Sequence, residues 1–134
     1  NTYVEWNGLV IGGLGSGLLD PHGKPDLSWL DAFSAAEGYK LLLCHHPEYF
    51  MPYIKETGIE LTVCGHAHGG QWRIPGLLNG LLAPDEGLFP QYAGGFYAMS
   101  DTSFIVSRGL AKESTRVPRL YNPPELVMID IVPK

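Results

Sequence analysis

Two short apolar runs constrain the fold of this chain more than any other feature. Residues 39–44 read YKLLLC and residues 59–64 read IELTVC, and such runs are typical of strands that are buried on both faces. The segment between them, 47–58, has a proline at its start and a glycine at its end, which favours a helix. A strand, a helix and a strand joined by short loops form a βαβ unit, whose strands are parallel.

The flanking segments extend this α/β pattern. Residues 7–15 predict a strand that runs into a glycine-rich loop, and residues 27–37 predict a helix with Asp26 as its N-cap. Residues 96–109 predict a hairpin, and the alternation in 125–132 predicts a closing strand. The expected fold class is therefore α/β, with a βαβ unit, a long loop and antiparallel strands.

Size and charge exclude several classes of protein. The chain has 134 residues, of which 45% are hydrophobic, and a net charge of −5, so it is one domain's worth of sequence with enough apolar side chains for a core. Its few Lys and Arg residues form no basic stripe, so we expect no nucleic-acid-binding patch. No run approaches the roughly 20 apolar residues of a membrane span. A cytoplasmic location and membrane association through a preceding segment both stay open.

Each of the two apolar runs ends in a cysteine that is followed by histidine. Cys44 and Cys64 are expected to be buried free thiols, because unpaired cysteine behaves as a small hydrophobic residue. A disulfide or thiolate ligation between the neighbouring strand ends is the alternative.

The histidines predict a metal site. His45 and His46 follow the first run, and His66 and His68 follow the second. Ligands gather at the carboxyl ends of parallel strands, so these side chains should meet at one edge of the sheet. In an extended segment, residues two apart point the same way, so His66 and His68 can reach one site. Adjacent residues point in opposite directions, so only one of His45 and His46 is expected to be a ligand. Imidazole suits zinc, iron, manganese and nickel. Structural histidines with hydrogen-bonded rings are the alternative.

Two motifs carry a family resemblance. LLLCHHPE at 41–48 and LTVCGHAHGGQ at 61–71 resemble the last two motifs of the calcineurin-like metallophosphoesterases. VSRGL and PRLYNPPELVMIDI, which follow, resemble a bacterial subgroup of that superfamily. The resemblance implies an αββα sandwich and hydrolysis of phosphate monoesters or diesters at two divalent metal ions, with Mn, Fe and Zn not distinguished. It implies that His45 and His66 bind one metal and that His68 binds the other.

The three N-terminal motifs of the family do not occur in this sequence. The resemblance therefore implies that residues 1–134 are a single partial domain, the C-terminal half of the sandwich. We expect it to be inactive alone, to contain no assigned catalytic residue, and to associate with a missing N-terminal half or with itself. Asp20 and His22 form an Asp-x-His sequence, but a Pro-Gly turn explains it equally well.

The residues after the second histidine motif are candidates for substrate binding. Gln71 and Arg73 could contact the phosphate of a phosphate-ester substrate, and a solvated loop is the alternative. A surface role is expected for Arg108 and Arg119. A different class of function is also open, because a degenerate, non-catalytic domain could use the long loop 69–95 to bind a partner.

Overall fold

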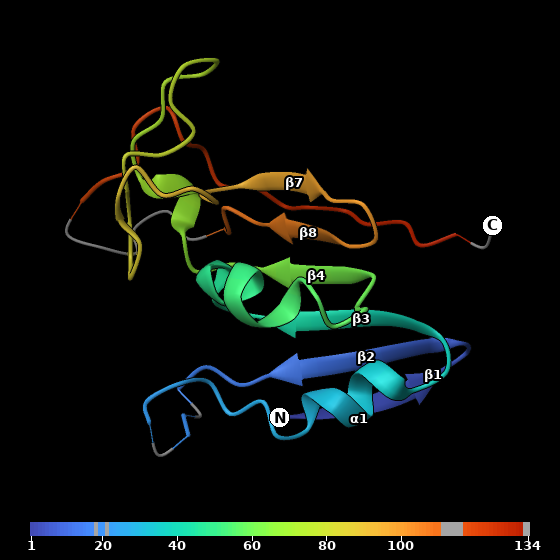
Figure 1. Ribbon diagram of the computed structural model, residues 1–134. Coiled ribbons are helices and arrows are strands. Elements are labelled where there is room, and N and C mark those ends of the chain that lie inside the picture. The colour runs from blue at the N-terminus through green and yellow to red at the C-terminus, as the bar shows by residue number, and fades with distance from the viewer. Residues whose placement is uncertain (18, 21, 111–116, 133–134) are drawn as a thin grey trace.

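One six-stranded sheet organises the molecule. The computed structural model describes residues 1–17, 19–20, 22–110 and 117–132 (Figure 1). The strands follow the order β1-β2-β3-β4-β8-β7; they are β1 (Thr2–Trp6), β2 (Leu9–Leu14), β3 (Tyr39–Cys44), β4 (Leu61–Cys64), β7 (Gly95–Ala98) and β8 (Ser103–Val106). The four inner strands are parallel, and the edge strands β1 and β7 are antiparallel to their neighbours. The predicted α/β class, the parallel β3–β4 pair and the β7–β8 hairpin are confirmed.

Short helices cover one face of this sheet (Figure 1). They are α1 (Leu30–Ala35), η1 (Pro47–Tyr49) and η2 (Phe50–Ile54), and η3 (His68–Gly70) follows β4. The predicted helix over 27–37 is shorter than expected, because Asp26 accepts a hydrogen bond from the Ser28 N–H in the preceding turn and Trp29 is the N-cap. Among the described residues, no helix has the length and apolar character needed to cross a membrane.

The sequence predicted an α-helix between β3 and β4, and this prediction was wrong. The connection is a 3₁₀ turn over 47–49 followed by one π-helical turn over 50–54. Pro52 lies inside the π-helical turn and has no N–H to donate to a preceding carbonyl, so a regular α-helical ladder cannot pass through it. The wide turn still directs Phe50 and Ile54 into the core.

β1 was not predicted. It pairs with β2 through the dipeptide Asn7-Gly8, whose φ angles are 49° and 80°. Two left-handed residues in a two-residue loop are typical of the tight hairpin turns that match the twist of the flanking strands. The hairpin adds an antiparallel edge to the parallel strands.

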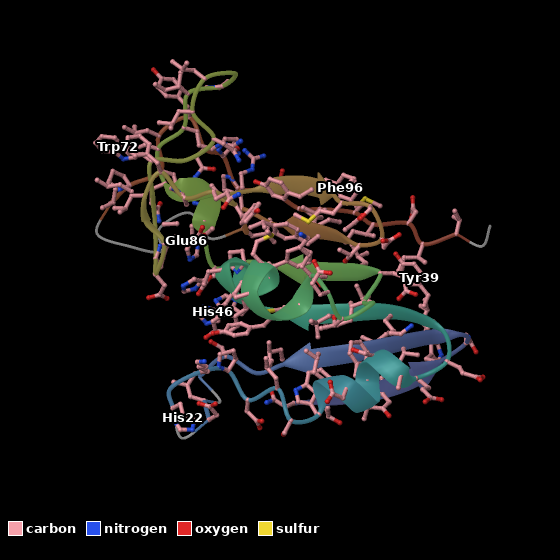
Figure 2. All side chains as sticks on the ribbon, viewed as in Figure 1. His22, Tyr39, His46, Trp72, Glu86 and Phe96 are labelled. Carbon is pink, nitrogen blue, oxygen red and sulfur yellow. The ribbon has the colours of Figure 1, made fainter. Side chains whose placement is uncertain are left out.

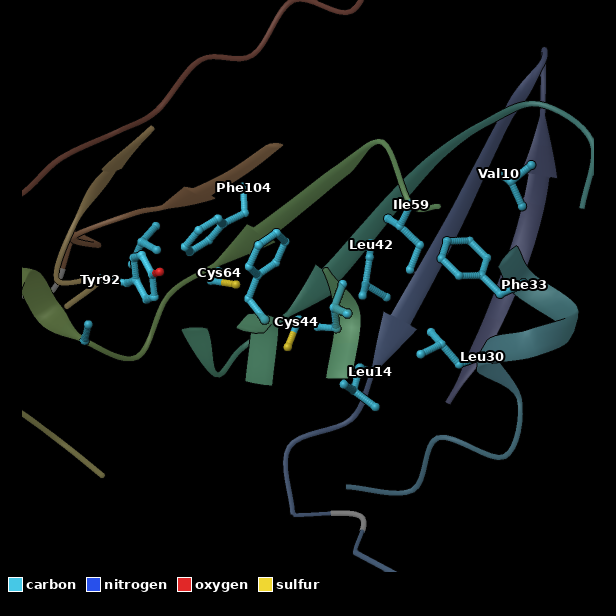
Figure 3. Close-up of a cluster of buried hydrophobic side chains, with 14 of the residues drawn as sticks. Val10, Leu14, Leu30, Phe33, Leu42, Cys44, Ile59, Cys64, Tyr92 and Phe104 are labelled. Atoms are coloured by element: carbon cyan, nitrogen blue, oxygen red, sulfur yellow. The ribbon is translucent and has the colours of Figure 1, made fainter. Parts of the chain in front are cut away.

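Aromatic side chains fill the space between the helices and the sheet (Figure 3). Phe33 of α1 is fully buried and lies over Gly12 of β2, where a Cβ atom would come within 2.8 Å of the Phe33 ring. Phe50 stacks on Phe104 of β8 with ring centroids 4.0 Å apart. These contacts hold the helical segments against β2 and β8, on either side of the central strands.

The predicted closing strand over 125–132 is wrong. The segment follows β7 and β8 without joining the sheet (Figure 1), and residues 125 and 127–130 line a cavity with Phe96 and Ile105. Its first anchors are polar: the Glu125 N–H donates to the Gly109 carbonyl, and the Glu125 carboxylate accepts from Arg108. Alternation of apolar residues was not enough, because a strand also needs backbone hydrogen bonds to a neighbour, and this segment does not pair with the edge strand β7.

The sheet face opposite the helices exposes apolar side chains. By strand alternation and register, Val4, Trp6, Leu43 and Phe96 share this face, and each is between 49% and 65% exposed. Exposed apolar side chains on one face of a sheet are typical of surfaces that contact another protein segment. The described residues form a six-stranded sheet and a two-stranded ribbon, and the assignment of 1–134 as half of a sandwich stays a prediction.

This face predicts self-association of the 134-residue chain. Light scattering at micromolar concentration should give a mass above 14.7 kDa, because covering several hundred Å² of apolar surface at about 25 cal/mol per Å² is worth several kcal/mol. The double substitution Trp6→Ser and Phe96→Ser should shift the mass towards the monomer, whereas Tyr121→Ser, outside the sheet, should not. A wild-type mass near 14.7 kDa with a cooperative thermal transition would contradict the half-domain prediction.

Candidate metal centre

The ends of β3 and β4 bring the two histidine motifs together. After the strands end, the Gly65 N–H donates to the His45 carbonyl at 3.1 Å and continues the parallel pairing by one hydrogen bond. His45 and His66 therefore lie next to each other, with 3.2 Å between His45 Nε2 and His66 Nδ1. His45 and His66 thus meet at this edge of the sheet, as the sequence predicted.

The second motif is not extended, and this part of the sequence reasoning was wrong. His66, His68 and Gln71 have φ angles of 59°, 49° and 53°, and Gly69 and Gly70 are also left-handed. A side chain in this region of φ/ψ costs of order 1–3 kcal/mol and persists only where the surroundings enforce it. We call residues 65–71 the hook, because the chain reverses within them.

Asn122 enforces the conformation of the hook. Its side-chain amide donates to the carbonyl of His68 at 2.7 Å and to that of Gln71 at 3.2 Å, and the residue is only 2% exposed. Trp72 N–H also donates to the Gly70 carbonyl at 2.6 Å. A residue that is 54 positions away in the sequence from His68 thus fixes the backbone that carries it.

His46 belongs to the same edge but has different partners. Its Nδ1 lies 2.8 Å from Glu48 Oε1, and its Nε2 lies 2.8 Å from Ser16 Oγ. The ring stacks on Tyr49 and has its centroid 4.3 Å from that of His66. Adjacent histidines were expected to diverge, yet both His45 and His46 lie against His66, with their own rings edge-on at 87°. Both nitrogens of His46 are engaged.

A loop carboxylate completes the group. Asp85 lies between the short strands β5 (Leu82–Ala83) and β6 (Gly87–Leu88), and its Oδ2 is 2.8 Å from His66 Nε2. His46, Glu48, His66 and Asp85 each offer one ligand atom, and these atoms all lie within 4.8 Å of one another. This group could hold a metal ion. Figure 2 shows His46 and the neighbouring Glu86 at the edge where the parallel strands end, with His22 farther away.

Burial and charge shape the ionisation of the group. Burial, followed by the charges of His66 and His46, lowers the pKa of His45. Burial, followed by the charge of Arg119, lowers the pKa of His68. Neutral imidazole is the form that binds a metal, so both environments favour the ligand form. In the part of the chain that the structure describes, the His68 ring has no hydrogen-bond partner.

Gln71, Arg73 and Asp20, the other residues considered from the sequence, have surroundings of their own. Gln71 is 2% exposed, so it is not part of a solvated loop, and both atoms of its side-chain amide are buried without a hydrogen-bond partner. Arg73 donates to the side chain of Asn79 within its own loop. Asp20 accepts the N–H groups of His22 and Lys24, as the turn explanation predicts.

The two cysteines are free and buried. The hydrogen bond with Cys44, followed by burial, raises the pKa of the Cys64 thiol. The Cys44 thiol donates to the His46 carbonyl at 3.3 Å. The expectation that both residues are buried free thiols is confirmed.

Sequence reasoning missed three polar side chains of this centre. Glu48 is only two residues after His46, and its acidic group within the motif was a usable signal. Ser16 and Asp85 gave no such signal, because they come from glycine-rich and proline-rich loops that lie 30 and 19 positions from their histidine partners.

Comparisons with known proteins identify the family. Phosphodiesterase YaeI of Escherichia coli is 32% identical over 93 residues, which cover 69% of this chain and 32% of that protein. The chain is related to the calcineurin-like metallophosphoesterases. An uncharacterized metallophosphoesterase of Bacillus subtilis, YkuE, is 28% identical over 110 residues, covering 81% of this chain and 36% of the relative. The predicted resemblance to metallophosphoesterases is confirmed.

The metallophosphoesterase relationship rests on these sequences alone. The chain spans about a third of the length of the curated relatives it matches. No family model matches it. No solved structure matches it either.

The close packing of the hook yields a prediction about glycine. A Cβ atom on Gly70 would overlap the backbone of Gly80, whereas one on Gly76 would meet nothing within 4 Å, and both residues have positive φ. Gly76→Ala should lower the free energy of unfolding by about 1 kcal/mol through backbone strain alone. Gly70→Ala should cost about 1–3 kcal/mol more through overpacking. Urea unfolding of the two variants measures this difference, and equal losses would contradict the described packing.

Proposed function

We propose that this chain supplies part of the metal centre of an enzyme that hydrolyses phosphate monoesters or diesters. The observation that carries the proposal is the 3.2 Å separation between His45 Nε2 and His66 Nδ1. Two imidazole nitrogens that bind one ion at about 2.0–2.1 Å are about 2.9–3.4 Å apart in octahedral or tetrahedral geometry. The pair is therefore spaced for shared coordination of a single ion.

The partners of each ring favour His45 over His46 as the ligand. His46 has Glu48 on one nitrogen and Ser16 on the other, so neither is free to bind an ion without breaking a contact. His45 Nε2 faces only His66. We propose His45 and His66 as ligands of one metal and His68 as a ligand of the other. The alternative group, in which His46, Glu48, His66 and Asp85 share an ion, has matching distances but requires these contacts to rearrange.

Divalent metals in such a centre supply positive charge for the phosphate oxygens and lower the pKa of bound water. The residues of this chain bind and orient: the strand ends fix His45 and His66, and the hook fixes His68. The proposal of two metals, with Mn, Fe and Zn not distinguished, follows from the family resemblance. Because bridging and amide ligands would come from the family's N-terminal motifs, we propose that the 134 residues alone hydrolyse little or no substrate and bind one metal weakly at most.

Gln71 and Arg73 are the proposed contacts to substrate. The buried amide of Gln71 has no partner of its own, which supports a role for it in binding. Arg73 already donates to Asn79, so Gln71 is the stronger candidate. Gln71 also lines a pocket with Leu82, Ala83, Pro84 and Val117, whose apolar side chains suit an apolar group of a substrate better than its phosphate.

A non-catalytic binding domain is the second candidate. The loop after the hook exposes large apolar side chains, among them Leu77 at 81% and Phe89 at 66%. Such side chains favour contact with another protein. Metal-dependent hydrolysis by the full-length protein would exclude this role as the sole function.

Replacing two histidines tests the enzyme. The full-length protein with Mn²⁺ should hydrolyse bis-p-nitrophenyl phosphate, and His66→Ala with His68→Ala should reduce the rate by more than about 100-fold, because even outer partners of metal ligands are worth 10–100-fold. His22→Ala is the control, since His22 is exposed in a separate loop. Full activity in the double variant, or after complete metal removal with a chelator, would refute the mechanism.

A second prediction separates the adjacent histidines. His45→Ala should lower the metal content of the purified full-length protein, measured by mass spectrometry of the metals, whereas His46→Ala should leave it near the wild-type value. The reason is that only His45 has a ring nitrogen directed at His66 Nδ1. Loss of metal from the His46 variant alone would instead support the group formed with Glu48 and Asp85.

A further inference from the structure

We infer that Asp85 is a positioning residue that fixes the imidazole of His66 for metal binding, and that the β5–β6 ribbon carries it to the centre. The inference rests on the proposed function, because it assumes that His66 is a metal ligand. Asp85 belongs to the long loop after the hook, outside both histidine motifs, so the inference gives this loop a role at the metal centre.

The two nitrogens of the His66 ring face different partners. Nδ1 faces His45 at 3.2 Å, and Nε2 lies 2.8 Å from Asp85 Oδ2. The two nitrogens of an imidazole point in divergent directions, so an ion shared with His45 takes Nδ1 and leaves Asp85 outside its coordination sphere. A carboxylate that accepts the Nε2–H keeps the lone pair on Nδ1 and holds the ring in place.

The β5–β6 ribbon holds Asp85 in its turn. The ribbon pairs Leu82 with Leu88 and Ala83 with Gly87, and Asp85 lies in its turn with a φ of 59°. The ribbon is attached to the hook, because the Leu81 N–H donates to the carbonyls of both Gly70 and Trp72 at 2.9 Å. Hydrogen bonds therefore join the hook and the chain just after it to the residue that precedes the ribbon.

The contact between Asp85 and His66 contributes little to the stability of the fold. The Asp85 side chain is 64% exposed, and an exposed ion pair contributes little to stability. The backbone at Asp85 is left-handed, a conformation that aspartate adopts more readily than most residues. The contact therefore adds little to the stability of the fold, and we expect its effect in metal binding.

The experiment compares Asp85→Ala, Asp85→Asn and the control Asp101→Asn, an exposed carboxylate in the β7–β8 turn, in the full-length protein. Titration calorimetry of the metal-free proteins with Co²⁺ should show about 10–100-fold weaker binding for Asp85→Ala. Asp85→Asn should lie between it and the wild type, because the amide oxygen still accepts a hydrogen bond but has no charge. Asp101→Asn should bind as the wild type does, and the thermal midpoints of the metal-free proteins should agree.

The visible spectrum of the Co²⁺ proteins separates positioning from ligation. At saturating Co²⁺, the Asp85 variants should keep the wild-type d–d bands, because the coordination sphere is unchanged. A spectrum with a different coordination number would make Asp85 a direct ligand and overturn the inference, as would unchanged affinity in Asp85→Ala. If the wild type binds no divalent metal, the inference and the proposed function both fail. If it binds metal but cleaves no phosphate ester, only the proposed function fails, and the affinities still decide the role of Asp85.

Discussion

The parallel pairing of β3 with β4 is the constraint on which the rest of the centre depends. Three residue pairs are in register, from Leu41 with Leu61 to Leu43 with Val63, and the Gly65 to His45 hydrogen bond closes the ladder at the carboxyl end. A shift of one residue would turn every side chain of a strand to the other face. The 3.2 Å approach of His45 to His66 is thus a direct consequence of strand register.

The surroundings of the histidines combine buried and strained groups. Glu48 Oε2, Glu86 Oε1 and the Gln71 amide are buried without hydrogen-bond partners, and burial raises the pKa of Glu86. Buried polar atoms without partners are rare in folded proteins. Together with the left-handed residues of the hook, these groups support the proposal that a polar ligand binds where the parallel strands end.

Local patterns allowed the parallel β3–β4 pair and the two histidine motifs to be predicted, because each depends on neighbouring residues. The α-helix expected between the two strands was wrong. The hairpin at Asn7-Gly8 was also encoded locally and was overlooked. The alternation in 125–132 was misleading, since a ladder depends on a partner strand that a single segment cannot specify. Asp85 could not have been predicted, because its position depends on how a loop with little regular structure folds back on the hook.

The hydrogen bonds from the Asn122 side chain to the hook have a consequence for the order of folding. The sheet partners of His45 and His66 are close in sequence, whereas the hydrogen bond from Asn122 to the His68 carbonyl spans 54 residues. Contacts of large sequence separation form at a greater entropic cost and slow the search for the native state. During synthesis, the strands that carry the first two histidines can pair long before Asn122 leaves the ribosome. We therefore expect the hook to reach its final shape after β3 and β4 have paired.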